Sequence, residues 1–206
     1  MEKLKDIISK HSFDQYLLYT LGIVFMPLGV VLTLRSELGA GGYDSLNFAI
    51  ADRLHINVSV AIWLTAVMVL IITVVIRHSR LRITTFVSSI FLGFSTDAWN
   101  GILHALHVRG IVLRIILLLI GIIIISIAVA AYILSGFPCN PTDDLVVALN
   151  ERGIPLGAGK FGFDCLCVIL SYLSGGSVGI GTVLCTVLIG PCVQIVSRLL
   201  RRITKI

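Results

Sequence analysis

Residues 165–197 read CLCVILSYLSGGSVGIGTVLCTVLIGPCVQIVS, a run of 33 residues without one charged side chain. A second uncharged run covers the 28 residues 115–142. The hydrocarbon core of a bilayer is about 30 Å thick and takes about 20 apolar residues in helical form, so both runs are long enough to cross it. Over the whole chain, 13% of the residues are charged and the mean hydropathy is +1.02. These values predict an integral membrane protein.

The apolar segments long enough to cross a bilayer determine the fold class. Only helices and closed barrels satisfy their own backbone hydrogen bonds in lipid, and these unbroken segments lack the two-residue alternation of barrel strands. We therefore expect an all-α, polytopic membrane bundle of about six transmembrane helices. Little chain remains for a water-soluble domain, so residues 1–206 are predicted to form a single membrane domain. The predicted spans are 16–35, 58–76, 83–106, 111–135, 156–173 and 180–197.

The lysines and arginines are divided unequally between the two sides of this predicted bundle. With the N-terminus inside, twelve of them flank the inner ends of the spans and four flank the outer ends. Cytoplasmic loops carry an excess of Lys and Arg, so both termini are predicted to be cytoplasmic. Flanking charges that meet anionic lipid headgroups account for the net charge of +5. The expected partner is therefore the lipid bilayer, and no nucleic acid is expected.

Two similar breaks follow the first and the fourth predicted span. The first reads LGAGGYDSL over residues 38–46, and the second reads FPCNPTDDL over residues 137–145. Each break is rich in Gly or Pro, carries an aspartate and leads into a short amphipathic segment. Asp44 and Asp143 align with an offset of 99 residues. The match predicts that the second half of the chain repeats the first.

A second match lies in the last span of each half. Thr85 precedes Gly93 by eight positions, and Thr182 precedes Gly190 by eight, with an offset of 97. A unit of three spans is odd, so its second copy lies upside down in the membrane. Inverted repeats around a central site are typical of many secondary transporters. The predicted repeats cover residues of about 14–107 and about 111–203.

The carboxylates of the two breaks have two possible roles. Asp44 in the first break, and Asp143 and Asp144 after Thr142 in the second, precede short helices at the place of an N-cap. In this interpretation they only cap the helices and complement the helix dipole. Alternatively, the two short helices re-enter the membrane and frame a pathway, because irregular backbone is tolerated at depth where it lines a cavity.

Asp164 is predicted to lie deep in the fifth span. It is eight residues from the inner end, which is on the order of 12 Å at 1.5 Å per residue. A carboxylate at that depth is expensive, so it is expected to face the bundle interior with a partner. Lys160 is four residues earlier on the same helical face. The pair either fastens the helix end or provides a carboxylate that titrates or binds substrate.

The remaining polar positions are less distinctive. Asp97 lies among polar neighbours near the outer end of the third span, where an interfacial position is favoured. His104 and His107 follow, and we expect solvated side chains there and no metal site. The candidate residues of a substrate or ion pathway are Asp164, Asp44, Asp143, Asp144, Asp97, Lys160 and Thr182.

Motifs of catalysis and nucleotide binding are missing from the sequence. Residues 157–160 read GAGK but lack the spacing and the following Ser or Thr of a phosphate-binding loop. We also find no nucleophile elbow, no HExxH helix and no Ser–His–Asp order. The chain is therefore not expected to be an enzyme or to need a cofactor.

Several short segments of the second half resemble a known family. They are GIPLG (153–157), FD (163–164), GG (175–176), GIGT (179–182) and IGP (189–191). These segments, with the aspartate-bearing loop at Asp44, are similar to the YczE/YyaS/YitT group of bacterial membrane proteins, nearest to the short YczE/YyaS type. The family loop often reads Pro-Trp-Asp where this chain has Gly-Tyr-Asp. The resemblance implies a multi-pass protein of the bacterial cytoplasmic membrane, in a group of which some members are suspected of export.

These observations favour a small-molecule transporter or exporter driven by an ion gradient. In that hypothesis Asp164 titrates or binds a cation, and the two aspartate loops form gates. One alternative is the substrate-binding membrane subunit of an ATP-driven importer. Another is a scaffold or regulatory factor that does not transport. A homo-oligomer or a second membrane protein is a possible partner in each case.

Overall fold

The computed structural model describes residues 13–78, 83–138, 140–176 and 178–204, and within them every regular element is a helix. This confirms the predicted all-α class. Six of the twelve cationic residues expected at the inner ends lie outside the described residues: Lys3, Lys5, Lys10, Arg80, Arg82 and Lys205. The helices are α2 (Phe13–Arg35), α3 (Gly42–Leu54), α4 (Val58–Arg77), α5 (Ile83–Ile102), α6 (Ile111–Leu134), α7 (Pro141–Glu151), α8 (Leu156–Leu173) and α9 (Ile180–Thr204).

Each predicted span is occupied by a helix of similar bounds. The sixth differs most, since it was expected to end at residue 197 and continues to Thr204. The third was expected to reach residue 106 and ends at Ile102, where the N–H of His104 bonds the carbonyl of Gly101 in a tight turn. By length and composition, four helices within the described ranges can cross a membrane: Phe13–Arg35, Val58–Arg77, Ile111–Leu134 and Ile180–Leu200. These apolar helices identify a multi-pass membrane protein.

Helices α2 and α6 form the most extensive helix pair of the bundle and approach each other closely at glycines. A methyl group built on Gly29 would lie 2.7 Å from the Ile125 side chain and 2.8 Å from the carbonyl oxygen of Gly121. Gly22 meets Tyr132 on α6 in the same way, at 2.6 Å. Small residues at such crossings let helix backbones pack directly in a membrane, so Gly22 and Gly29 permit the close approach of α2 and α6.

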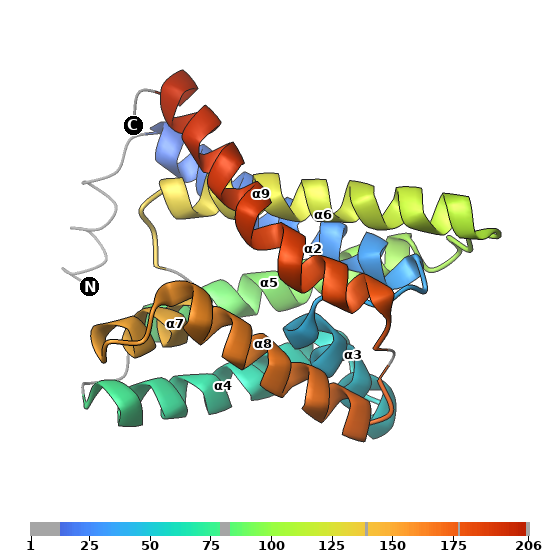
Figure 1. The fold of residues 1–206 in the computed structure, drawn as a ribbon, viewed down its shortest axis with the longest axis horizontal. Helices are drawn as coiled ribbons and strands as arrows, with labels where there is room; N and C mark the ends of the chain where they lie inside the picture. The colour runs from blue at the N-terminus through green and yellow to red at the C-terminus, as the bar shows by residue number, and fades with distance from the viewer. Residues whose placement is uncertain (1–12, 79–82, 139, 177, 205–206) are drawn as a thin grey trace.

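The two short helices, α3 and α7, are each held by spans from both halves of the chain. Helix α3 packs against α8 and α4, and α7 packs against α4 and α8 (Figure 1). Of the two short helices, α7 lies at the end of the bundle where α2 starts and α9 finishes, while α3 lies toward the opposite end. The half-chains are therefore interlocked.

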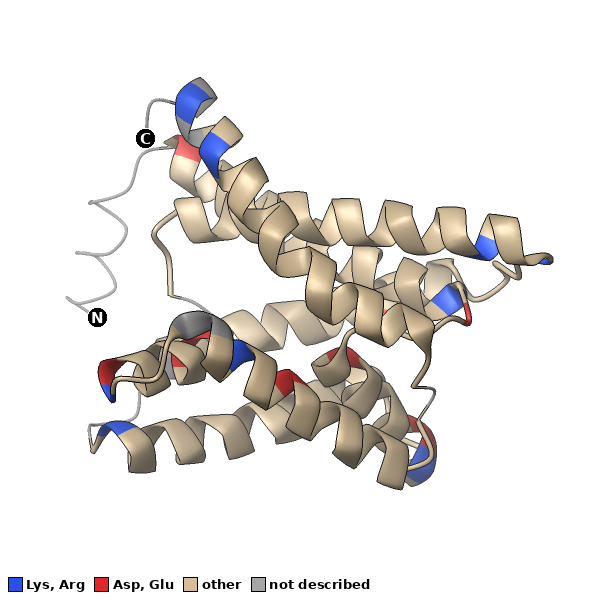
Figure 2. Ribbon diagram, in the orientation of Figure 1, with Lys and Arg blue, Asp and Glu red and all other residues tan. Residues whose placement is uncertain are grey.

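Charged residues gather at the two ends of the helices and leave the middle largely apolar (Figure 2). The outward faces of the long helices carry exposed side chains such as Met68, Ile72 and Ile123. A soluble protein rarely exposes apolar patches of this extent, whereas a bilayer covers them. The exceptions in the middle are acidic positions on α3 and α8 (Figure 2).

Candidate functional site

The carboxylates of the two breaks do not occupy the helix N-caps, which corrects the capping interpretation. The N-cap residues are Gly41 for α3 and Asn140 for α7, and neither forms a side-chain cap hydrogen bond. Asp44 and Asp143 are each the third residue of their helix. They share one structural position in two helices, still within the first turn where negative charge complements the dipole.

Asp164 lies on α8 with Lys160 one turn earlier. The Nζ atom of Lys160 donates a hydrogen bond to a carboxylate oxygen of Asp164 over 3.1 Å. The Asp164 side chain is 10% exposed and that of Lys160 is 47% exposed. This confirms the predicted pair, in which the carboxylate is buried and its cationic partner reaches the surface.

The fold brings Asp44 and Asp143 to this pair from opposite halves of the chain. Each of the two carboxylates interacts electrostatically with both Lys160 and Asp164. Three carboxyl groups thus interact electrostatically with one ammonium group. The lysine compensates only one negative charge, so full ionisation of the cluster is unfavourable.

The electrostatics of the cluster favour protonated carboxyls on the short helices, which lie outside the four candidate spans. Burial raises the pKa of Asp44 to about 7, while Lys160 lowers it and Asp164 raises it. Burial also raises the pKa of Asp143, again with opposing effects of Lys160 and Asp164. The phenol of Tyr132 donates a hydrogen bond to Asp143. The cluster of Asp44, Asp143, Lys160 and Asp164, called the carboxyl cluster below, can therefore hold a proton near neutral pH.

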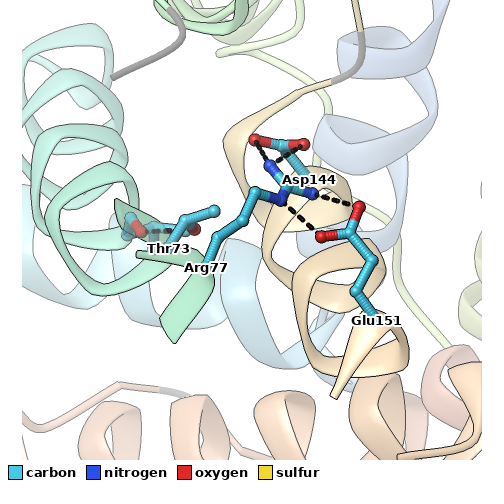
Figure 3. A network of polar contacts seen from close by, with 5 residues as sticks. Thr73, Arg77, Asp144 and Glu151 are labelled. Carbon is cyan, nitrogen blue, oxygen red and sulfur yellow. Dashed lines mark hydrogen bonds and ion pairs between the residues drawn. The ribbon is translucent and has the colours of Figure 1, made fainter. Parts of the chain in front are cut away.

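Asp144 belongs to a different group at the end of α4. Arg77 donates from Nη1 to both carboxylate oxygens of Asp144, at 3.0 and 3.1 Å. Its Nε and Nη2 atoms donate to Glu151, at 2.7 and 3.3 Å (Figure 3). The side chains of Arg77 and Asp144 are 8% and 7% exposed. This forked ion pair fastens α7 to α4 and gives Asp144 a structural role.

Asp97 and Thr182 also lie in structural contacts. Asp97 on α5 accepts the backbone N–H of Ser59 at 3.1 Å and so caps the start of the neighbouring helix α4. Thr182 accepts the N–H of Gly179 through its hydroxyl, at 3.3 Å, and donates its own N–H back to the Gly179 carbonyl. That reciprocal pair resembles a capping box at the start of α9.

Sequence reasoning did not identify a buried polar group beside Asp44. The hydroxyl of Thr65 on α4 donates to the side-chain oxygen of Asn47 at 2.6 Å and lies 3.0 Å from the Tyr43 hydroxyl. The Asn47 amide donates to the Tyr43 carbonyl. The spacing of four between Tyr43 and Asn47 could have revealed one polar face on α3, but nothing local identifies Thr65 as its partner.

Two further features limit the chemistry available. The described residues contain no group of three His, Cys, Asp or Glu side chains placed to hold a metal ion. A small cavity with room for about one water molecule lies beside the second break, lined in part by Tyr19, Ser88, Pro138 and Asn140. The arrangement is suited to proton exchange and charge recognition.

Comparison with known families matches most of the chain. The model of one family, described as "Family of unknown function (DUF6198)", matches residues 13–198. No solved structure matches this sequence.

Three relatives come from two bacteria. The chain is 25% identical to the "Uncharacterized protein YyaS" of Bacillus subtilis (strain 168) over 180 residues, which is 85% of this chain and 88% of that protein. It is 25% identical to the "Uncharacterized membrane protein YczE" of the same bacterium over 177 residues, 84% of this chain and 80% of that protein. An "Uncharacterized protein" of Haemophilus influenzae (strain ATCC 51907 / DSM 11121 / KW20 / Rd) is 26% identical over 197 residues, 92% and 85% of the two chains. The resemblance to the YczE/YyaS type is confirmed.

Proposed function

This chain belongs to DUF6198, a family of unknown function, and we propose that it is a small-molecule transporter driven by an ion gradient in the bacterial cytoplasmic membrane. Protons are the coupling ion in this proposal. The observation that carries it is the carboxyl cluster, where carboxyls from both short helices meet the buried Asp164 and its lysine. Ionisable groups inside a membrane bundle are costly and mark ion or substrate pathways.

The proposal includes two inverted repeats of three spans, which repeated local geometry supports. After α2, the N–H of Leu38 donates to the hydroxyl of Ser36 at 3.2 Å. After α6, the N–H of Phe137 donates to the hydroxyl of Ser135 at 3.3 Å. In both places the serine hydroxyl donates to the carbonyl three residues earlier. The two turns lie 99 residues apart, the same offset that relates Asp44 to Asp143.

Packing between the halves also repeats with partners exchanged. The break after α2 is fastened to the start of α9, because the N–H of Gly181 donates to the carbonyl of Leu38 at 2.7 Å. The break after α6 is fastened to α5, because the hydroxyl of Ser88 donates to the carbonyl of Pro138 at 3.1 Å. In each half the break is fixed by the third long helix of the other half. A two-fold axis in the membrane plane, as in many secondary transporters, produces this exchange.

The orientation with both termini in the cytoplasm rests on the cationic residues. Arg35, Arg53, Arg109 and Arg114 lie at the end where α2 finishes and α6 begins. Among the described residues, the other end of the bundle carries Arg77, Arg152, Arg198, Arg201 and Arg202, and this excess favours its exposure to the cytoplasm. A reporter protein that is active only in the cytoplasm, fused after residue 108 or after residue 206, tests this orientation. We expect reporter activity only for the fusion at residue 206.

The function is tested by ligand-induced stabilisation of the purified protein in detergent. A panel of cationic, neutral and anionic metabolites and drugs is added at pH 6 and pH 8, and the melting temperature is recorded for the wild type and Asp164→Asn. A compound present at 100 times its Kd stabilises the native state by about 2.7 kcal/mol. We expect at least one compound to stabilise the wild type in a pH-dependent way and to have little effect on Asp164→Asn.

The matched control is Arg53→Ala, which removes an exposed charge far from the cluster. It should respond to the same compounds as the wild type. Equal stabilisation of Asp164→Asn by those compounds would exclude Asp164 from the binding site. If the folded wild type is stabilised by none of these compounds, the proposal that this chain transports a small molecule by itself is contradicted.

A further inference from the structure

The two halves differ in how their last two long helices pack. Helix α4 packs along α5, whereas α8 hardly contacts α9. Figure 1 shows α8 and α9 diverging from the loop that joins them toward the end where the described chain starts and finishes. All the other main packing relations of the first half have a counterpart in the second. The α8–α9 pair is therefore the one place where the repeated packing is broken.

The α4–α5 contact is made by an aromatic side chain over a glycine. A methyl group built on Gly93 would lie 3.1 Å from the Cα atom of Ser59 and closer still to the indole nitrogen of Trp63. The Trp63 ring also meets the edge of Phe94, with 5.0 Å between ring centroids. This nitrogen is buried without a hydrogen-bond partner among the described residues.

The counterparts of these residues stand apart on α8 and α9. Helices α4 and α8 begin 98 residues apart, and α5 and α9 begin 97 apart. With these offsets Trp63 corresponds to Phe161, and Gly93 corresponds to Gly190. Phe161 is 58% exposed, and a methyl group built on Gly190 would meet nothing within 4 Å. An aromatic residue and a glycine thus occur again at the matching positions, without the contact.

We propose that the protein has a second conformation in which α8 closes onto α9, with Phe161 packed over Gly190, while α4 separates from α5. This inference rests on the proposed function and adds its conformational cycle. Closure of one helix pair and opening of the other would carry each half into the packing that the other half now has. Access to the carboxyl cluster would then pass from one side of the membrane to the other, as in transporters with inverted repeats.

The composition of the two contacts makes such an exchange feasible. Lipid chains are as apolar as the side chains they replace, so parting two helices in a bilayer has no large hydrophobic cost. Both contacts would place an aromatic ring over a glycine. Two packings of nearly equal free energy are what a switching bundle requires. Lys160, half-exposed near the start of α8, would be covered as α8 closes.

Cysteine cross-linking tests the second conformation without any substrate. The five native cysteines are replaced by alanine or serine, and Phe161→Cys and Gly190→Cys are introduced together. Both positions have room for the new side chain. A short bifunctional thiol reagent is applied to the protein in proteoliposomes, and intact-mass and peptide mass spectrometry record links within one chain. The matched control pair, Trp63→Cys with Phe94→Cys, reports the contact already present.

We expect both pairs to link within one chain, the control faster. Because the link is irreversible, the Phe161/Gly190 product accumulates even where the second state holds only roughly 0.1–10% of the molecules. Linking of the control pair first should slow the other link in a variant carrying all four cysteines. Linking of the control pair alone would overturn the proposal. Links between two chains through Gly190→Cys would also overturn it, since this face would then be a dimer contact.

The outcomes separate this proposal from the proposed function. Links within one chain in a protein that no compound stabilises would support the conformational change and count against transport by this chain alone. If a compound binds in a pH-dependent way that requires Asp164, and the Phe161/Gly190 link does not form, the binding site is supported and this conformational change is rejected. A thermal melt of the variant with no native cysteines confirms that it is folded before linking.

Discussion

The far ends of the two short helices are fastened very differently, although the helices hold equivalent places in the two halves. Helix α7 is fixed to α4 by the buried fork of Arg77 on Asp144 and Glu151. The far end of helix α3 meets α8 through an exposed contact, in which Arg53 donates to the carbonyl of Leu173 at 3.2 Å. Common packing thus does not imply equal attachment. The α4–α7 contact includes a buried ion pair, whereas the far end of α3 has an exposed hydrogen bond to α8.

The largest expected effect comes from breaking the Arg77 fork. Replacement Asp144→Asn removes the buried negative charge beside the guanidinium and leaves its bonds to the half-exposed Glu151. Removal of one member of a buried pair costs up to about 3–5 kcal/mol, and the remaining pair reduces this cost. The free energy of unfolding, measured by denaturant titration in detergent, should therefore fall by an amount at the lower end of that range. Arg53→Ala should change it by less than about 0.5 kcal/mol, as for most exposed substitutions. Equal losses would mean that the two attachments do not differ.

Glycine substitutions should distinguish the packed α2–α6 crossing from the open α8–α9 side. In Gly29→Ala the new methyl group meets Ile125 and the backbone of Gly121, and overpacking of this kind costs about 1–3 kcal/mol. In Gly190→Ala the new methyl group has no neighbouring atom within 4 Å. Alanine is more favourable than glycine in a helix by up to about 1 kcal/mol of stability. Thermal melts of both variants should therefore shift in opposite directions. A loss at Gly190 equal to that at Gly29 would show that α9 is covered.

The cap supplied by Asp97 should have a smaller effect. Asp97→Ala removes the acceptor for the Ser59 N–H, and loss of a helix cap costs about 0.5–2 kcal/mol. Asp97→Asn keeps an acceptor and should recover most of the stability. The counterpart in the other half, 97 residues on, is the exposed Gln194, and Gln194→Ala should have no measurable effect on the melting temperature. A full loss in Asp97→Asn would assign the effect to charge instead of to capping.

The smallest expected effects are shifts in the titration of Asp44. Lys160 lowers the pKa of Asp44 and Asp164 raises it. Lys160→Met should therefore keep the Asp44 carboxyl protonated to higher pH, and Asp164→Asn should let it ionise at lower pH. Infrared difference spectra of the protonated carboxyl band report this, with Asp44→Asn identifying the band. Shifts of both variants in one direction would contradict the geometry of the cluster.

The sequence allowed the helices and one ion pair to be predicted, because both depend on neighbours along the chain. Apolar length defines a span, and a spacing of four residues places Lys160 beside Asp164. The ion pairs of Arg77 with Asp144 and Glu151 could not be predicted. The sequence around a charged residue at the end of a span does not show whether its side chain contacts lipid headgroups or another helix. The capping role expected of Asp44 and Asp143 was wrong for a related reason. The N-cap residues, Gly41 and Asn140, lie three residues before these carboxylates, and the sequence of a Gly- or Asn-containing break does not define that boundary.

The exchange of partners between the halves has a consequence for biosynthesis. Helix α3 leaves the ribosome long before α8, against which it packs, because about 100 residues separate their sequences. At 5–20 residues per second this delay is on the order of 10 s. During that time Asp44 has neither Lys160 nor Asp164 beside it, and the first half is in the membrane without the helices that complete its packing. The insertion machinery or a membrane chaperone would have to shelter the first half until the second is made.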